Sequence, residues 1–96
     1  MTGRDIAAIV RLYPTRDGGK SRPIRPGYRC PCFVRPDKAP GGWDVRIEFD
    51  GPPLEPGGER RVRLRFLISK GEAAIVRAGR FYLWELRFVG EGEIVA

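Results

Sequence analysis

The residues whose types and spacing could support chemistry lie close together between Asp17 and Arg35, in the segment DGGKSRPIRPGYRCPCFVR. The segment contains a Gly-Gly turn followed by lysine and serine, a basic proline-rich arm, and two cysteines separated by one proline. Such residues occur in phosphate-binding loops, nucleic-acid contacts and thiolate metal sites. Each of these sites makes a different demand on the rest of the chain.

The tetrapeptide GGKS at 18–21 resembles the end of a phosphate-binding loop. The full motif needs a glycine five positions before Gly19, and that position holds Pro14. It also needs a following helix whose amides face the phosphates, which Pro23 and Pro26 forbid. The tetrapeptide therefore predicts a β-turn with glycines at positive φ and no nucleotide cofactor.

Cys30 and Cys32 flank Pro31 and fall on one face of a strand. A thiolate metal site needs about four ligands, and the chain has no other cysteine and no histidine. Along a strand their Cα atoms lie roughly 6.5–7 Å apart, at the limit for a disulfide. We interpret both as small buried apolar residues and expect no bound metal.

The sequence offers no catalytic constellation. Histidine, the commonest general base, is absent. The acidic residues are scattered over loops and strand exteriors, and no serine or threonine occupies a nucleophile elbow. We therefore predict that the protein is not an enzyme.

Positive charge is concentrated in the proline-rich arm. The whole chain carries a formal net charge of +6 with a pI near 10.0. Five basic residues between positions 16 and 29 face a single acid, Asp17: they are Arg16, Lys20, Arg22, Arg25 and Arg29. The arm indicates an exposed loop that meets a polyanion such as RNA, or simply a solvated surface, since an arginine-rich composition can also reflect the genome.

Two other groups of side chains allow a binding function. Arg61, Arg63 and Arg65 alternate along one strand and could line an RNA backbone, although a solvated strand face is the favoured interpretation. The aromatic residues Tyr82 and Trp84 could stack on bases, contact a protein, or belong to the core.

Alternating apolar residues and Pro/Gly turns predict a single all-β domain spanning 1–96. Strands are expected over 5–13 (with a helix as alternative), 28–35, 43–49, 60–68 and 80–88, followed by a last strand ending at Val95. Pro31 places its strand at an edge or bulge. Segments 15–26, 36–42 and 50–58 are predicted loops, and 69–79 is either one helical turn or a strand and loop. Six short strands predict a small antiparallel barrel or sandwich.

The predicted core consists of one face from each of several strands. Four residues of the first strand point inward, as do three of the third and four of the fourth. These residues are Ile6, Ala8, Val10 and Leu12; Val45, Ile47 and Phe49; and Val62, Leu64, Phe66 and Ile68. In the fifth strand, Phe81 and Leu83 oppose Tyr82, Trp84 and Leu86.

Compartment is predicted from what the sequence lacks. No apolar run approaches the roughly 18–20 residues of a membrane span. The first ten residues, MTGRDIAAIV, contain only a brief apolar patch and no small-residue cleavage site. We therefore expect a cytoplasmic protein without a signal peptide or a membrane partner.

From about Ile9 to Val95 the segments resemble the third, C-terminal domain of elongation factor Tu. They are VRLYPTRDGGKSRPI, GYR, VRIEF, LEPGGERRVRLRFLIS, AGRFYLWE and RFVGEGEIV, in that order. The resemblance implies a six-stranded antiparallel barrel that is not catalytic. In that family the domain helps to hold the T stem of aminoacyl-tRNA, contacts the nucleotide exchange factor and packs against the GTPase domain, which this chain does not contain.

The resemblance carries over position by position. Gly18 and Gly19 match the family's Gly-Gly turn, and Lys20 falls where the family has an arginine that approaches the tRNA. Ser21 stands in place of a histidine, Cys30 in place of a proline and Pro31 in place of a glutamine near the RNA. Tyr28, Arg29 and Arg35 are kept, and Gly79, Arg80 and Phe81 resemble a Gly-x-Arg-Phe region. Glu85, Leu86 and Arg87 replace a longer Gly-Gly turn that faces the tRNA.

The predicted function is that of a non-catalytic, translation-associated binding module. Its partner is a translation GTPase, the exchange factor or a tRNA-like RNA, with a protein slightly favoured because Pro31 and Leu86 depart from the family. The alternative is a protein-interaction adaptor unrelated to translation that uses an exposed aromatic face. The expected contact residues are Gly18, Gly19, Lys20, Ser21, Arg22, Arg25, Arg29, Arg35, Tyr82, Trp84 and Arg87.

Overall fold

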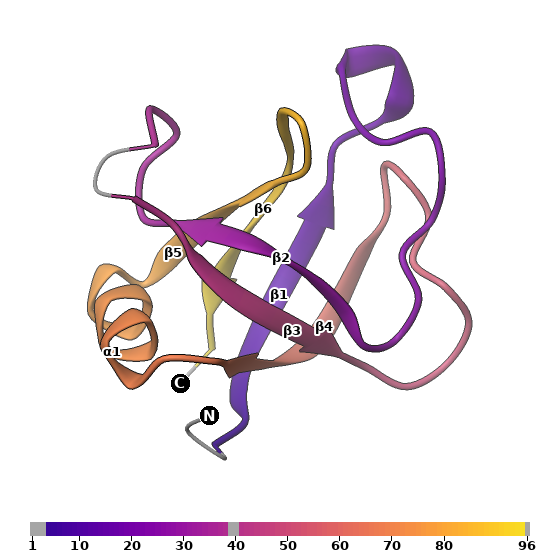
Figure 1. Ribbon diagram of the computed structural model, residues 1–96. Coiled ribbons are helices and arrows are strands. Elements are labelled where there is room, and N and C mark those ends of the chain that lie inside the picture. Colours follow the sequence, from indigo (N-terminus) through magenta and orange to yellow (C-terminus); the bar gives the residue numbers. More distant parts are fainter. Residues whose placement is uncertain (1–3, 39–40, 96) are drawn as a thin grey trace.

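Six antiparallel strands close into a barrel with the order β1-β4-β3-β2-β5-β6 (Figure 1). The computed structural model describes residues 4–38 and 41–95. The strands are β1 (Ile6–Leu12), β2 (Tyr28–Phe33), β3 (Trp43–Glu48), β4 (Glu59–Phe66), β5 (Arg80–Trp84) and β6 (Phe88–Ile94). The predicted small all-β barrel is confirmed. Residues 39 and 40 of the predicted 36–42 loop lie outside the described part.

Period-2 alternation places one side of each strand in the barrel interior, as predicted. Ile6, Ala8, Val10 and Leu12 are buried, as are Val45, Ile47 and Phe49. Val62, Leu64 and Phe66 of β4 are also buried. The prediction for Ile68 is wrong: β4 ends at Phe66, and Ile68 is half-exposed at the start of a helix.

Pro31 is accommodated where β2 has only one partner strand. It lies opposite Asp44 of β3, whereas β2 pairs with β5 only at Cys32 and Phe33. A residue without an N–H can therefore occupy β2 without leaving a β5 acceptor unpaired. A register irregularity occurs in the neighbouring strand β5, between Leu83 and Trp84, rather than at Pro31.

The ambiguous segment 69–79 forms a ten-residue helix, α1 (Ser69–Ala78), which is longer than the single turn considered from sequence. Its residues include the helix formers Glu72, Ala73 and Ala74. Ile75 is fully buried in the core, so packing against the barrel supplies stability that a short isolated helix lacks. In the described residues, no helix is both long and apolar enough to cross a membrane.

The predicted strand 80–88 is divided in two. β5 ends at Trp84 and β6 begins at Phe88, with Glu85, Leu86 and Arg87 as the connection. Leu86 has a φ of 65°, and the Glu85 amide donates to the Arg87 carbonyl at 2.8 Å. This local reversal turns what reads as one alternating strand into a hairpin.

The proline-rich arm is fixed to the barrel at its middle. Ile24 is 1% exposed and belongs to the core. Its amide donates to the Leu54 carbonyl at 2.9 Å, and the Leu54 amide returns a bond of 2.8 Å. The two loops that contain these residues run side by side in Figure 1. The arm is thus an exposed loop with one buried anchor.

Candidate partner-binding site

The Gly-Gly turn begins the candidate site. A short 3-10 helix, η1 (Thr15–Asp17), leads into Gly18, whose φ is 90°. Gly19 has no positive φ; a Cβ there would lie 2.0 Å from the carbonyl oxygen of Tyr13. The prediction of positive φ is therefore correct for Gly18 and wrong for Gly19. Gly19 is required because the backbone passes so close to Tyr13.

Lys20 is turned toward the β5–β6 hairpin. Its Nζ lies 2.8 Å from both carboxylate oxygens of Glu85, and its side chain is only 11% exposed. The ammonium also lies 5.3 Å from the ring centroid of Tyr28, whose hydroxyl donates a hydrogen bond to the same carboxylate. Lys20, Tyr28 and Glu85 therefore join the arm, β2 and the hairpin.

Two hydrogen bonds keep the Glu85 carboxylate ionised. The hydrogen bond from Lys20, and next that from Tyr28, lower the pKa of Glu85. Burial and the hydrogen bond to Glu85 raise the pKa of Tyr28. At neutral pH the carboxylate balances the lysine, so Lys20 presents little net charge to a phosphate.

A groove of about 280 Å³ separates the arm from the hairpin. It is lined by residues 20–22 on one side, and by residues 85–87 and Val89 on the other. The fold thereby brings together four of the expected contact residues: Lys20, Ser21, Arg22 and Arg87. Sequence reasoning did not place Glu85 in the site, because a pair 65 residues apart leaves no local signal.

The arginines of the arm and hairpin lack acidic partners. Within the described part of the chain, no ion pair involves Arg16, Arg22, Arg25, Arg29 or Arg87. Arg16 lies in η1, Arg22 and Arg25 lie between η1 and β2, and Arg29 lies in β2. We call these five residues the arm surface. The other bases without an ion pair to a described residue are scattered or bonded otherwise: Lys38, Arg60, Arg61, Lys70, Arg77 and Arg80.

Four of the strand arginines are neutralised by acids: Arg11, Arg46, Arg63 and Arg65. Arg11 lies within 4 Å of Glu59, Glu91 and Glu93. Arg63 lies 3.6 Å from Asp50. We therefore retain the interpretation that Arg63 belongs to a solvated strand face.

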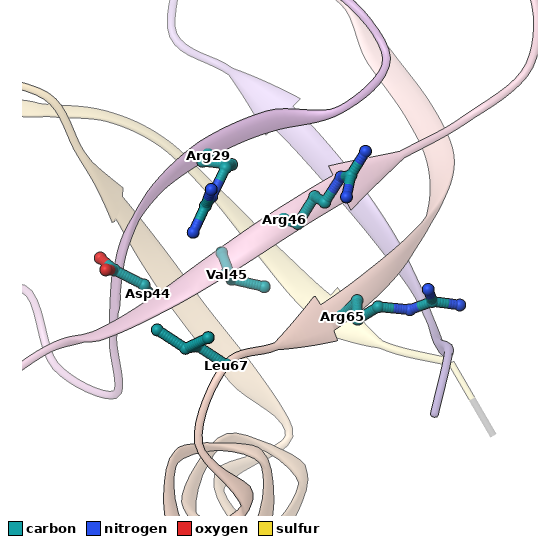
Figure 2. A pocket seen from close by; sticks show the side chains of 6 residues that line it. All are labelled: Arg29, Asp44, Val45, Arg46, Arg65 and Leu67. Carbon is teal, nitrogen blue, oxygen red and sulfur yellow. The ribbon is translucent and has the colours of Figure 1, made fainter. Parts of the chain in front are cut away.

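Arg29, Arg46 and Arg65 lie directly opposite one another across β2, β3 and β4. They border a depression of about 90 Å³ together with Asp44, Val45 and Leu67 (Figure 2). Two of the guanidinium groups turn away: Arg46 lies 2.7 Å from Glu48, and Arg65 lies 2.8 Å from Asp5. In Figure 2 the three side chains do not converge on a common point, so the depression is no preformed anion site.

Tyr82 and Trp84 belong to an aromatic cluster on the outside of the barrel. Phe88 packs edge-on against both, with ring centroids 6.2 Å from Tyr82 and 5.0 Å from Trp84. Phe33 adds edge contacts with Phe88 and Trp84. The Lys38 ammonium lies 4.1 Å from the centroid of the Trp84 ring. Tyr82 and Trp84 are half-buried. The alternating sequence pattern did not predict that Phe88 packs against both of them.

The remaining expected residue, Arg35, lies apart from the groove lining. Its guanidinium donates to the carboxylate of Asp37 at 2.9 and 3.2 Å, and both side chains are exposed. This local pair satisfies the charge of Arg35 without a partner molecule.

Cys30 and Cys32 are buried free thiols, as predicted. Burial raises the pKa of Cys30 to about 12 and raises that of Cys32 as well. Both are therefore protonated and unreactive at neutral pH. Among the described residues, no group of three or more His, Cys, Asp or Glu side chains could hold a metal ion.

Comparison with known proteins adds no relative: no protein-family model matches the sequence, and no curated protein matches it. The likeness to the third domain of elongation factor Tu therefore remains a resemblance of motifs and their order.

Proposed function

We propose that the protein is a non-catalytic module that binds RNA through the phosphates facing the arm surface. The observation that carries this proposal is the distribution of ion pairs. Arg11, Arg46, Arg63 and Arg65 on the strand faces are matched by acids, whereas Arg16, Arg22, Arg25, Arg29 and Arg87 have no ion pair to a described residue. Four of these guanidinium groups lie close together in the sequence, and a cluster of uncompensated positive charge attracts a polyanion.

The scaffold beneath the arm surface supports this role. The buried anchor at Ile24 and the Lys20–Glu85 pair hold the arm at two points, so its arginines project from a fixed loop. A fixed loop loses less conformational entropy on binding than a free one. Lys20 holds the loop in place through its ion pair with Glu85. Arg22 lines the same groove and is the better candidate for a phosphate contact.

The link to translation comes from the resemblance to the third domain of elongation factor Tu. Under that proposal the RNA is tRNA-like, and any GTP hydrolysis is supplied by another protein. Sequence departures at Pro31 and Leu86 favoured a protein partner slightly. The ion-pair distribution, which depends on the fold, shifts our preference to RNA.

The test is titration of fluorescent bulk tRNA at several salt concentrations. The variant Arg22→Gln/Arg25→Gln/Arg87→Gln removes three arm-surface charges. We expect it to weaken binding and to flatten the slope of log affinity against log salt by about 2–3 units. The matched control Arg46→Gln/Arg63→Gln/Arg65→Gln removes the same formal charge from ion-paired positions. Equal losses in both variants would show attraction by net charge alone and would contradict a defined site.

A protein-interaction adaptor is the second candidate, supported by the half-exposed aromatic cluster at Tyr82 and Trp84. Aromatic contacts dominate many protein interfaces and depend weakly on salt. A pull-down from the source cell with and without RNase separates the two candidates. Capture that survives RNase and the arm variant, but is lost in Trp84→Ala with an unchanged melting temperature, would favour the adaptor.

A further inference from the structure

Leu86, at the tip of the β5–β6 hairpin, combines two unfavourable properties. Its side chain is 89% exposed, and its φ is 65°. A bulky residue rarely adopts this left-handed conformation, which glycine or asparagine takes at lower cost. Exposure means that burial does not offset the strain. The folded domain therefore gains little from a leucine at this position.

The backbone on both sides of Leu86 is held firmly. Glu85 accepts hydrogen bonds from Lys20 and Tyr28, and its amide donates to the carbonyl of Arg87 at 2.8 Å. Val89, three residues beyond the tip, is buried in the core. The apolar side chain is thus presented from a rigid support, and residues held in sparsely populated conformations by their surroundings often mark functional sites.

Charge around the tip indicates what Leu86 meets. Arg22 and Arg87 line the same groove as Leu86, and neither has an ion pair to a described residue. The Glu85 carboxylate lines the same groove but is paired with Lys20 at 2.8 Å, so this pair offers little net charge to a phosphate. Arg22 and Arg87 are therefore the residues of this groove that can meet phosphates, which leaves the apolar tip to a part of the ligand without charge.

We infer that Leu86 packs against the face of an unpaired nucleobase while Arg22 and Arg87 contact the flanking phosphates. This inference rests on the proposed binding of RNA and specifies the kind of RNA. In a duplex the base faces are covered by stacking, whereas in loops and single strands they are open to packing against side chains. The module should therefore prefer unpaired RNA to a fully paired helix.

The test uses fluorescence anisotropy with two labelled RNA probes: an unstructured 15-mer and a fully paired duplex of equal length. Leu86→Gly and Leu86→Asn both tolerate positive φ. Each should lose about tenfold affinity for the unstructured probe, because a contact burying much of a leucine is removed. Affinity for the duplex and the salt slope for both probes should stay unchanged, because no charge is lost. Leu86→Met keeps an apolar side chain and should retain wild-type affinity.

Each outcome of this experiment either supports or contradicts the contact between Leu86 and a base. Relief of backbone strain predicts that the Gly and Asn variants melt at the same temperature as wild type or higher, so a binding loss with intact melting cannot be assigned to unfolding. Wild-type affinity of both variants, or equal losses for duplex and unstructured RNA, would overturn the base contact. In that case the RNA-binding proposal still stands if the arm variant flattens the salt slope. A flat salt slope in the wild-type protein would instead overturn the RNA-binding proposal.

Discussion

The Lys20 ammonium contacts both carboxylate oxygens of Glu85 at 2.8 Å, across 65 residues of sequence. This pair holds the arm against the β5–β6 hairpin and neutralises the lysine that the motif resemblance predicted at an RNA contact. A residue expected to bind thus holds the site in shape, while its neighbour Arg22 remains without an acidic partner in the described chain.

The pair predicts a pH dependence of stability. Because the folded-state pKa of Glu85 is lowered, its contribution is fully present above the unfolded pKa of about 4.3 and is lost as pH falls through the folded value. Glu85 is largely exposed, so Glu85→Gln should cost only about 0.2–1 kcal/mol at pH 7. Urea denaturation at pH 7 and pH 3 should show this difference shrinking at the lower pH. A difference that grows on acidification would contradict the assigned direction.

Tyr28→Phe provides a related prediction at the other end of the pH scale. Loss of the hydrogen bond to Glu85 should cost about 0.5–1.5 kcal/mol at pH 7. The folded-state pKa of Tyr28 is raised, so its contribution is present below the unfolded pKa near 10 and is lost as pH rises above it. Denaturation curves of wild type and variant should therefore converge between pH 7 and pH 11. Curves that stay parallel would show that the hydroxyl does not make this bond.

The two glycines of the turn should respond differently to alanine. At Gly19 a Cβ would overlap the Tyr13 carbonyl, so Gly19→Ala should cost more than about 2 kcal/mol. At Gly18 the space is open and only the positive φ opposes substitution, so Gly18→Ala should cost about 1 kcal/mol. Thermal melts of both variants measure the order. A larger loss at Gly18 would contradict the close approach at Gly19.

The cysteines should behave as packing residues. Cys30→Ala/Cys32→Ala should lower stability by roughly 1–3 kcal/mol and leave RNA affinity unchanged. The native thiols should react slowly with a disulfide reagent at pH 8 and rapidly in denaturant, since burial raises their pKa values. Fast labelling of the native protein, or stoichiometric zinc in it, would refute this interpretation.

Strands were predictable because their apolar period of two is local. Val45, Ile47 and Phe49 could be assigned to the interior from spacing alone, and their burial confirms it. The segment 69–79 was ambiguous because its helix depends on packing of Ile75 against the barrel, which is a tertiary effect. The alternation pattern missed the hairpin at Leu86 because the connection contains neither glycine nor proline, whereas the resemblance placed a short connection at Glu85, Leu86 and Arg87.

The candidate site was predictable in its residue types and not in its electrostatics. The arginine-rich arm is visible in the sequence, and the structure places Arg22 and Arg87 on one groove. Whether a given base has an acidic partner depends on register and hairpin geometry. The pairs Lys20–Glu85 and Arg65–Asp5 join residues 65 and 60 positions apart, so they required the fold.

The pairing of β1 with both β4 and β6 has a consequence for how the chain folds. β1 is the earliest strand and β6 the last of those described, so the barrel cannot close until nearly all of its sequence is available. During synthesis one hydrogen-bonding edge of β1 stays unpaired until β6, almost eighty residues later, has been made. Topologies with such distant pairings fold slowly, on the order of milliseconds to seconds. Exposure to aggregation should therefore be greatest before β6 leaves the ribosome.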